Sequence, residues 1–228
     1  MEPGGNRPRS GHIRLLVVDD HRVFAQALAT ALGLERDIRA RAVSSALEAL
    51  ASSQEDPPQV ALVDLEMRGM GGTQLLRRFR EQLPEVRLVA ISAHDDDLAK
   101  ARALEAGAIG YVSKLAQLDH VAEAVRTAAR GDPLVDGQEQ RRLLRRLRHQ
   151  RHQDATERQR ANRLTPRQIE ILQMMADGVP AARIAERLGV SSATFRTHVQ
   201  NLITRLGVHS KTEALALAIR QGRVTARG

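Results

Sequence analysis

Cysteine is absent from this chain of 228 residues. Its absence excludes disulfide bonds, thiolate-bound zinc and thiol catalysis. Aromatic residues are also scarce, at 2% of a sequence that is 42% hydrophobic, so the core must be built from Leu, Val, Ile and Ala. No apolar run approaches the roughly 20 residues that cross a bilayer, and the first residues lack the apolar stretch of a signal peptide. We therefore expect a cytoplasmic protein with no membrane partner.

The net charge of +8 is unevenly distributed along the chain. Residues 1–131 hold 17 Lys and Arg against 18 Asp and Glu, residues 132–163 hold 9 against 5, and residues 164–228 hold 9 against 4. A neutral part followed by a basic part favours a nucleic-acid-binding module joined to a neutral one. A solvated surface with an arginine bias explains the charge equally well, since only three of the basic residues are lysine.

The first half of the chain alternates between two apolar patterns. Residues 1–11 are rich in glycine, proline and polar groups, which predicts a disordered tail. Short runs typical of buried strands then recur at about 13–18, 38–43, 60–64, 86–91 and 109–112. Helical patterns follow them at about 21–33, 45–53, 72–83, 95–106 and 115–130. Five strand–helix units predict a doubly wound α/β domain over residues 12–131, with a five-stranded parallel sheet covered on both faces.

The second half begins after the Gly131-Asp132-Pro133 break. Residues 132–163 are mostly polar, and their one helical apolar stripe is Leu143, Leu144 and Leu147. We expect a linker there, helical in its first half and loose in its second. A small all-α domain is predicted over residues 164–228, with Thr165 capping its first helix. Its helices are expected at about 166–177, 181–188, 192–206 and 210–221, and Gly178, Gly189 and Gly207 would end the first three.

Chemically active side chains stand at the ends of the predicted strands. Asp19 and Asp20 follow the first strand, Asp64 ends the third, Ser92 follows the fourth and Lys114 follows the fifth. Because the functional crevice of an open parallel sheet lies outside the carboxyl ends of its strands, we expect these side chains to converge. Crowded carboxylates repel one another unless a hard cation such as Mg²⁺ lies between them. The pattern indicates phosphoryl chemistry on an aspartate.

The residue types indicate which role each side chain would have in phosphoryl transfer. The carboxylate of Asp64 can act as a nucleophile towards phosphorus. Asp19 and Asp20 can bind the metal, and the backbone carbonyl of Glu66 could supply a further oxygen ligand. The Ser92 hydroxyl and the Lys114 ammonium can contact the phosphoryl oxygens. Each residue alone could be a turn former, a helix cap or a surface lysine, so the prediction depends on the complete set.

Residues 13–130 resemble the receiver domain of bacterial two-component response regulators. The resemblance rests on the motifs VVDDHRVF, LVDLEMRGMGG, AISAH and GYVSK. It implies a flavodoxin-like fold, with Asp64 as phosphoacceptor, Asp19 and Asp20 as Mg²⁺ ligands, Ser92 and Lys114 as switch hydroxyl and lysine, and Tyr111 as switch aromatic. Tyr111 can also be an ordinary core tyrosine. The family often has Met-Pro where this chain has Met67-Arg68, and without the proline ring we expect a looser loop.

Two helical patterns in the second domain, ARIAERLGV and SSATFRTHVQNLITRLGV, are joined by the tight turn that a helix-turn-helix requires. Their apolar faces hold Ile184, Ala185 and Leu188 in the first and Val199, Leu202, Ile203 and Leu206 in the second. Ser191 or Ser192 would cap the second helix. Its other side carries groups suited to bases and phosphates: Thr194, Arg196, Thr197, Gln200 and Asn201. A short polar helix of an ordinary bundle would show the same pattern.

Residues 164–218 closely resemble the LuxR-type helix-turn-helix domain. The matching motifs are LTPR, IAERLGV, THV, and LGV followed by TEA. The resemblance implies base contacts by Arg196, Thr197 and Gln200, and a dimer contact by the last helix. It also implies that the remaining DNA contacts come from Ser191, Thr194, His198, Asn201 and Lys211. Phe195 stands where the family commonly has a smaller Val, which could change how the helix is seated.

The order of the two domains resembles a NarL/FixJ-type response regulator. That resemblance implies transcription controlled by phosphorylation, with a sensor histidine kinase as phosphodonor, double-stranded DNA as target and a homodimer as active form. The receiver would catalyse only its own phosphoryl transfer and dephosphorylation. Alternatives are an aspartate-nucleophile phosphatase, a small-molecule-sensing LuxR-type activator and a regulator with an unphosphorylated receiver. The first would need Asp-x-Asp and a cap domain, the second an aromatic-lined pocket, and the complete acidic set argues against the third.

Overall fold

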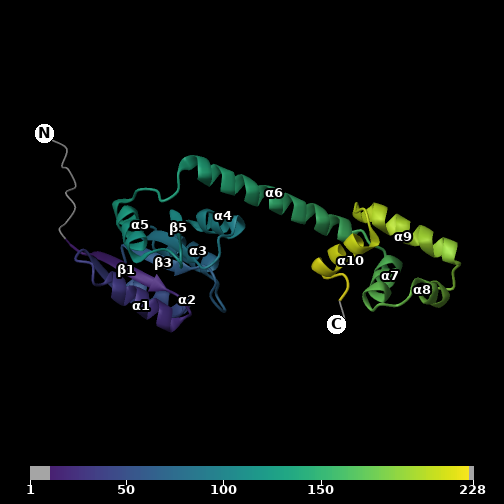
Figure 1. The fold of residues 1–228 in the computed structure, drawn as a ribbon, viewed down its shortest axis with the longest axis horizontal. Coiled ribbons are helices and arrows are strands. Elements are labelled where there is room, and N and C mark those ends of the chain that lie inside the picture. The colour runs from purple at the N-terminus through teal and green to yellow at the C-terminus, as the bar shows by residue number, and fades with distance from the viewer. Residues whose placement is uncertain (1–10, 226–228) are drawn as a thin grey trace. The chain divides into compact units, whose positions relative to one another are not determined.

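The computed structural model describes residues 11–225, which are divided between two compact units (Figure 1). The first unit ends at Leu147 and the second begins at Arg148. Nearly all of the tail predicted over residues 1–11 lies outside the described residues. Within residues 11–225, no helix has both the length and the apolar composition needed to cross a membrane.

A five-stranded parallel sheet forms the centre of the first unit, in the order β2-β1-β3-β4-β5. The strands are β1 (Ile13–Val18), β2 (Ile38–Val43), β3 (Val60–Asp64), β4 (Arg87–Ser92) and β5 (Gly110–Ser113). All four strand pairings are parallel, as the sequence predicts. The strand order reverses between β1 and β3, and this switch point is where an open α/β sheet forms its crevice.

Five helices cover the two faces of the sheet: α1 (Arg22–Leu32), α2 (Ala46–Glu55), α3 (Gly72–Gln82), α4 (Asp97–Ala106) and α5 (Leu118–Arg130). On one face, Leu16 and Val63 belong to a core shared with α2, α3 and α4. On the other face, Val17 and Leu62 belong to a core shared with α1 and α5. The central strands are therefore buried on both sides, which explains their unbroken apolar sequences. The predicted doubly wound fold is confirmed.

Gly72 opens α3 directly behind the end of β3. A Cβ atom at this position would lie 1.9 Å from the backbone carbonyl oxygen of Asp64. Any other residue would therefore displace the strand end that carries the Asp64 carboxylate. Glycine allows the loop and the helix to pass this close to the strand.

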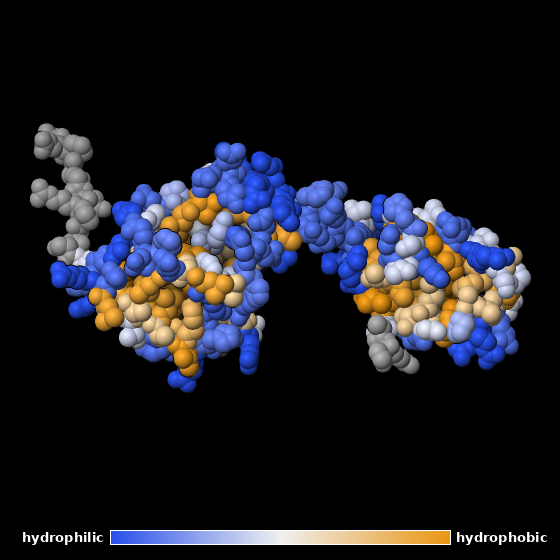
Figure 2. Space-filling model, in the orientation of Figure 1, coloured by the Kyte–Doolittle hydropathy of each residue, from blue (hydrophilic) through white to orange (hydrophobic). Residues whose placement is uncertain are grey.

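One long helix, α6 (Gly137–Asn162), follows the last strand–helix unit. The expectation of a loose second half was wrong, because the helix continues to Asn162 without a break. Leu143 and Leu147 are buried against Ala101 and Leu104 of α4, so the first turns of α6 belong to the first unit. The visible surface of the connecting helix is hydrophilic (Figure 2). This explains why the segment looks like a linker in the sequence although two of its leucines are core residues.

Ion pairs reinforce the packing of α6 on α4. The Asp97 carboxylate accepts hydrogen bonds from Arg142 at 3.0 Å and from Arg146 at 2.9 Å. The hydrogen bond from Arg142 holds the pKa of Asp97 below its ordinary value, and burial opposes this effect. A carboxyl whose pKa is lowered by folding stabilises the fold above its unfolded-state pKa. That contribution is lost as the pH falls through the folded-state pKa.

Asp97→Asn is expected to lower the free energy of unfolding of the first unit by up to about 1 kcal/mol near pH 7, the usual size for partly exposed ion pairs. The deficit should be the same at about pH 5 and should shrink as the pH falls through the lowered folded-state pKa of Asp97, because the wild-type carboxyl then becomes protonated as well. Urea titrations of both proteins across this range measure the effect. If the stability deficit of Asp97→Asn has the same size at low pH, its cause is lost packing and not lost charge.

The second unit contains the end of α6 and a small bundle of α7 (Pro166–Ala176), α8 (Ala181–Arg187), α9 (Ser192–Leu206) and α10 (Lys211–Arg220). All four helices contribute to one core, in which Ile184, Leu202 and Leu217 are almost completely buried. The predicted Thr165 cap is part of a full capping box with Gln168. An ion pair of 3.2 Å between Glu157 and Arg220 links the end of α6 to the bundle. The predicted all-α domain is confirmed.

Candidate functional site

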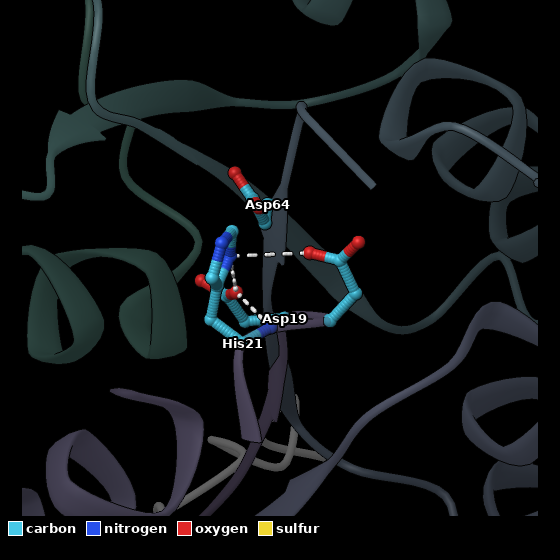
Figure 3. Close-up of side chains that lie close together, drawn as sticks. Asp19, His21 and Asp64 are labelled. Carbon is cyan, nitrogen blue, oxygen red and sulfur yellow. Dashed lines mark hydrogen bonds and ion pairs between the residues drawn. The ribbon is translucent and has the colours of Figure 1, made fainter. Parts of the chain in front are cut away.

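Three carboxylates meet at the carboxyl ends of β1 and β3. Asp64 is the last residue of β3, and Asp19 and Asp20 follow β1 directly. The side chains of Asp19 and Asp64 are fully buried, and that of Asp20 is 18% exposed. Figure 3 shows Asp19 and Asp64 on neighbouring strand ends with their carboxylates close together. The sheet thus brings together three acidic groups that the sequence separates.

Lys114 lies between two of these carboxylates. Its Nζ atom is 2.5 Å from Asp19 Oδ2 and 2.9 Å from Asp64 Oδ2, and its side chain is only 13% exposed. Burial disfavours the ammonium, but the two carboxylates outweigh it and raise the pKa of Lys114 above its ordinary value. Lys114 is therefore an internal counter-charge and not a surface lysine.

Buried oxygens at this site lack ordinary partners. Burial raises the pKa of the Asp64 carboxyl above its ordinary value, although the Lys114 ammonium opposes the effect. Asp19 Oδ2, Asp20 Oδ1 and Asp64 Oδ2 are buried without a hydrogen bond, and Lys114 faces two of them only as an ion-pair partner. Buried carboxylate oxygens without hydrogen bonds are costly unless a cation compensates them. This all-oxygen donor set fits a hard divalent cation such as Mg²⁺.

The loop after β3 is tied to the acidic site by its backbone. The amide of Glu66 donates to Asp64 Oδ1 at 3.2 Å, and the amide of Arg68 donates to Asp20 Oδ2 at 3.0 Å. Proline has no N–H, so the common Met-Pro sequence could not make the second hydrogen bond. The sequence predicts a looser loop here, whereas the structure gives the loop a contact that the proline would remove.

Two histidines at the site have no place in the sequence prediction. His21 Nδ1 lies 3.3 Å from Asp19 Oδ1 and 3.2 Å from Asp20 Oδ1. His94 Nδ1 lies 2.7 Å from a carboxylate oxygen of Glu66, at the outer edge of the site. For His21 the signal was its position directly after the acidic pair. For His94, which lies 28 residues from Glu66, no local signal existed.

The contacts that the structure gives for Ser92 and Tyr111 are with groups other than the three carboxylates. The Ser92 hydroxyl accepts a hydrogen bond from the backbone N–H of His94 and donates to its carbonyl oxygen, so its bonds are within its own loop. Tyr111 is half-buried and packs against the cluster shared by α4 and α6. The Lys100 ammonium lies 4.4 Å from the centre of its ring. Its place at the edge of the core agrees with the prediction of a core tyrosine, and its role as a switch aromatic stays a prediction.

The second candidate site is the outer surface of α9. Ser191 caps this helix by accepting a hydrogen bond from the backbone N–H of Thr194 at 3.1 Å. Phe195 is buried in the core, so the larger side chain seats the helix from within. Most of the predicted DNA contacts are exposed, namely Ser191, Thr194, Arg196, Thr197, Gln200, Asn201 and Lys211, and His198 is half-buried. The helix therefore presents a continuous polar side to solvent.

The fold and the sites define a receiver-type regulator: a carboxylate site on a parallel sheet, joined to a helix-turn-helix domain. Residues 15–126 match the family model of the response regulator receiver domain. Residues 162–218 match that of the bacterial regulatory proteins of the luxR family. Together these two matches cover both of the sites described above.

Relatives along almost the whole chain agree with this class. The transcriptional regulatory protein LiaR of Bacillus subtilis (strain 168) is 31% identical over 209 residues, which cover 91% of this chain and 97% of LiaR. The transcriptional activator ExaE of Pseudomonas putida is 34% identical over 210 residues, which cover 91% of this chain and 96% of ExaE. The crystal structure of the response regulator ChrA covers 93% of this chain and 99% of ChrA, with 27% identity and a TM-score of 0.52.

The chain belongs to the family of two-component response regulators that carry a LuxR-type DNA-binding domain. It is a transcriptional regulator and not a conventional enzyme. The phosphatase and the small-molecule-sensing activator that the sequence leaves open are thereby set aside.

Proposed function

We propose that a sensor histidine kinase phosphorylates Asp64 and that this reaction controls the DNA binding of the second domain. The observation that carries the proposal is a fully buried Asp64 carboxylate at 2.9 Å from the Lys114 ammonium, beside two further carboxylates. An oxygen of Asp64 would form the bond to phosphorus while the bond from phosphorus to the donor nitrogen breaks. The Lys114 ammonium and the Ser92 hydroxyl would then contact the phosphoryl oxygens.

Mg²⁺ would be held by Asp19, Asp20, Asp64 and the backbone carbonyl of Glu66. When bound, it would supply positive charge to the phosphoryl oxygens during the transfer. The buried oxygens of Asp20 and Asp64 that lack hydrogen bonds support this assignment. The Lys114 ammonium would neutralise part of the carboxylate charge as well, through its contacts with Asp19 and Asp64.

The output is specific binding to double-stranded DNA by α9. Arg196, Thr197 and Gln200 would contact bases, while Ser191, Thr194, His198, Asn201 and Lys211 would position the helix on the phosphates. A homodimer through α10 would place two such helices on two half-sites. The side chain of Tyr111, which packs in the cluster shared by α4 and α6, would change its position when Asp64 is phosphorylated. The protein would act in the cytoplasm.

Gel filtration and DNA binding at fixed salt test this function directly. Incubation of the full chain with acetyl phosphate and Mg²⁺ is expected to increase both its apparent mass and its affinity for DNA. Asp64→Asn should show neither change, because it lacks the accepting carboxylate. If the wild type is phosphorylated but neither its apparent mass in gel filtration nor its DNA affinity changes, phosphorylation does not control DNA binding and the proposed function is wrong.

Arg196→Ala is expected to weaken specific DNA binding by about 1–3 kcal/mol if Arg196 contacts a base edge. Binding to random DNA should change less, and the base preference at one position of each half-site should relax. Fluorescence anisotropy over a salt series separates this outcome from a phosphate contact, which would lower the salt slope by about one for every sequence. Arg158→Ala removes the same charge from the exposed side of α6 and serves as the control.

A further inference from the structure

Among residues 11–225, one group of acidic and imidazole side chains has the spacing of a metal site: Asp19, Asp20, His21 and Asp64. The acidic members are the residues already assigned to Mg²⁺. His21 adds a nitrogen donor to this otherwise all-oxygen group. Figure 3 shows its ring beside the carboxylate of Asp19, with Asp64 close by.

The distances of His21 suit a shared cation. Ligands at about 2.1 Å from an octahedral ion lie about 3.0 Å apart when adjacent and about 4.2 Å apart when opposite. His21 Nδ1 is 3.3 Å from Asp19 Oδ1 and 3.2 Å from Asp20 Oδ1, close to the spacing of adjacent ligands. One ligand atom from each of the four residues lies within 4.8 Å of the others. Small side-chain movements would bring all four to one ion.

The local structure leaves the ring of His21 available for this role. His21 is the N-cap residue of α1, but its side chain makes no capping hydrogen bond. Its backbone N–H donates to Asp19 Oδ1 at 2.9 Å, which fixes the main chain beside the carboxylates. Without a metal, Nδ1 donates to the Asp19 carboxylate, because an ionised carboxylate can only accept. A cation bound at Nδ1 would take the place of that proton, and the ring, whose side chain is 70% exposed, can then carry its proton on Nε2 in water.

Unpartnered oxygens provide a second observation that points to a cation. Asp64 is completely buried, and its Oδ2 atom has no hydrogen bond, so its one charged partner among residues 11–225 is the Lys114 ammonium at 2.9 Å. Asp20 Oδ1, which lies 3.2 Å from His21 Nδ1, is buried and also lacks a hydrogen bond. Carboxylate oxygens that are withdrawn from water in this way gain most from a metal ion.

We propose that His21 is a nitrogen ligand of the cation at the acidic site and shifts its metal preference from Mg²⁺ towards first-row transition ions such as Mn²⁺. The inference rests on the proposed metal site of the receiver. Mg²⁺ takes oxygen ligands almost exclusively and keeps several waters. An imidazole nitrogen is a good ligand for first-row transition ions, so it adds affinity for them and little for Mg²⁺.

Pulsed electron paramagnetic resonance of the full chain with Mn²⁺ below one equivalent tests this ligand. The wild type is expected to show the nitrogen coupling of a directly bound imidazole, and Asp64→Asn should lose it together with the metal. His21→Gln should lose the coupling but still bind Mn²⁺, with a Kd raised by about tenfold or more, as changes around metal sites commonly do. The Kd for Mg²⁺, measured by competition, should change by less than about threefold.

His94→Gln is the matched control, because His94 contacts Glu66 at the edge of the site and lies outside the four-residue group. It should keep both the nitrogen coupling and the Mn²⁺ affinity. Mn²⁺ binding without nitrogen coupling in the wild type, or coupling that persists in His21→Gln, would overturn the role of His21 and leave the metal site intact. Failure of the wild type to bind Mn²⁺ and Mg²⁺ would remove the proposed metal site as well.

Discussion

Asp64→Asn is expected to abolish phosphoryl labelling of the chain by a small phosphodonor in the presence of Mg²⁺. The amide nitrogen and oxygen of asparagine cannot replace the carboxylate as a nucleophile towards phosphorus. The labelled species is an acyl phosphate, so it should be stable in acid and lost in alkali. Mass spectrometry of the intact protein measures the fraction labelled.

Two further variants define the site around this nucleophile. Asp20→Asn should slow labelling through weaker metal binding without preventing it. Glu66→Gln is the control, because that side chain is 54% exposed and only its backbone is assigned to the site. Undiminished labelling of Asp64→Asn would show that another residue accepts the phosphoryl group and would refute the assignment.

Lys114→Ala is expected to destabilise the metal-free first unit by about 3–5 kcal/mol at neutral pH, the usual cost of leaving buried charges unpaired. Taken alone in the sequence, Lys114 could equally be a surface lysine, whose loss would cost little. The structure places its ammonium within 3 Å of two fully buried carboxylates, at 2.5 Å from Asp19 and 2.9 Å from Asp64. Without the ammonium these two carboxylates would repel each other in a buried position.

The pH dependence of this variant has a definite sign. Burial already raises the pKa of Asp64 with Lys114 present, and removal of the ammonium should raise it further. When folding raises the pKa of a carboxyl, the folded protein loses stability as the pH rises above the unfolded-state pKa of that group. The deficit of Lys114→Ala should therefore be smaller at about pH 5 than at about pH 7.

Urea titrations of the two proteins, with and without Mg²⁺, measure these effects. Mg²⁺ should restore part of the lost stability, because it would supply positive charge to the same carboxylates. Lys100→Ala is the matched control, since Lys100 pairs with Asp95, whose side chain is 88% exposed, and should cost about 1 kcal/mol or less. If Lys114→Ala and the wild type are equally stable at neutral pH, the ion pairs of Lys114 with Asp19 and Asp64 contribute nothing to stability.

The acidic site could be predicted from the sequence because its positions follow from the sheet. Buried parallel strands are unbroken apolar runs, and the residue that ends each run must lie at the same edge of the sheet. Asp19 and Asp64 are neighbours because β1 and β3 are adjacent in the sheet, a strand order that the structure supplies. Their degree of burial, and the contact of Lys114 with both, depend on side-chain packing that no local pattern encodes.

Helix α6 was mispredicted for a physical reason. The second half of this segment contains Ala161 but no leucine stripe, so a periodicity argument finds no apolar face there. In the structure Ala161 is buried at the end of the helix, and Glu157 pairs with Arg220 from a distant part of the sequence. Tertiary contacts of this kind outweigh local propensity, which is a weak predictor of where a polar helix ends.

Tyr111 gives the protein an optical property that follows from its place in the fold. It is the only tyrosine, and there is no tryptophan, so the ultraviolet emission of the unlabelled chain arises essentially from one side chain. That side chain lies three residues before Lys114 and packs in the cluster that joins α4, β5 and α6, beneath the Lys100 ammonium. The intensity and anisotropy of this emission therefore report directly on the region between the acidic site and the connecting helix, without any introduced fluorophore.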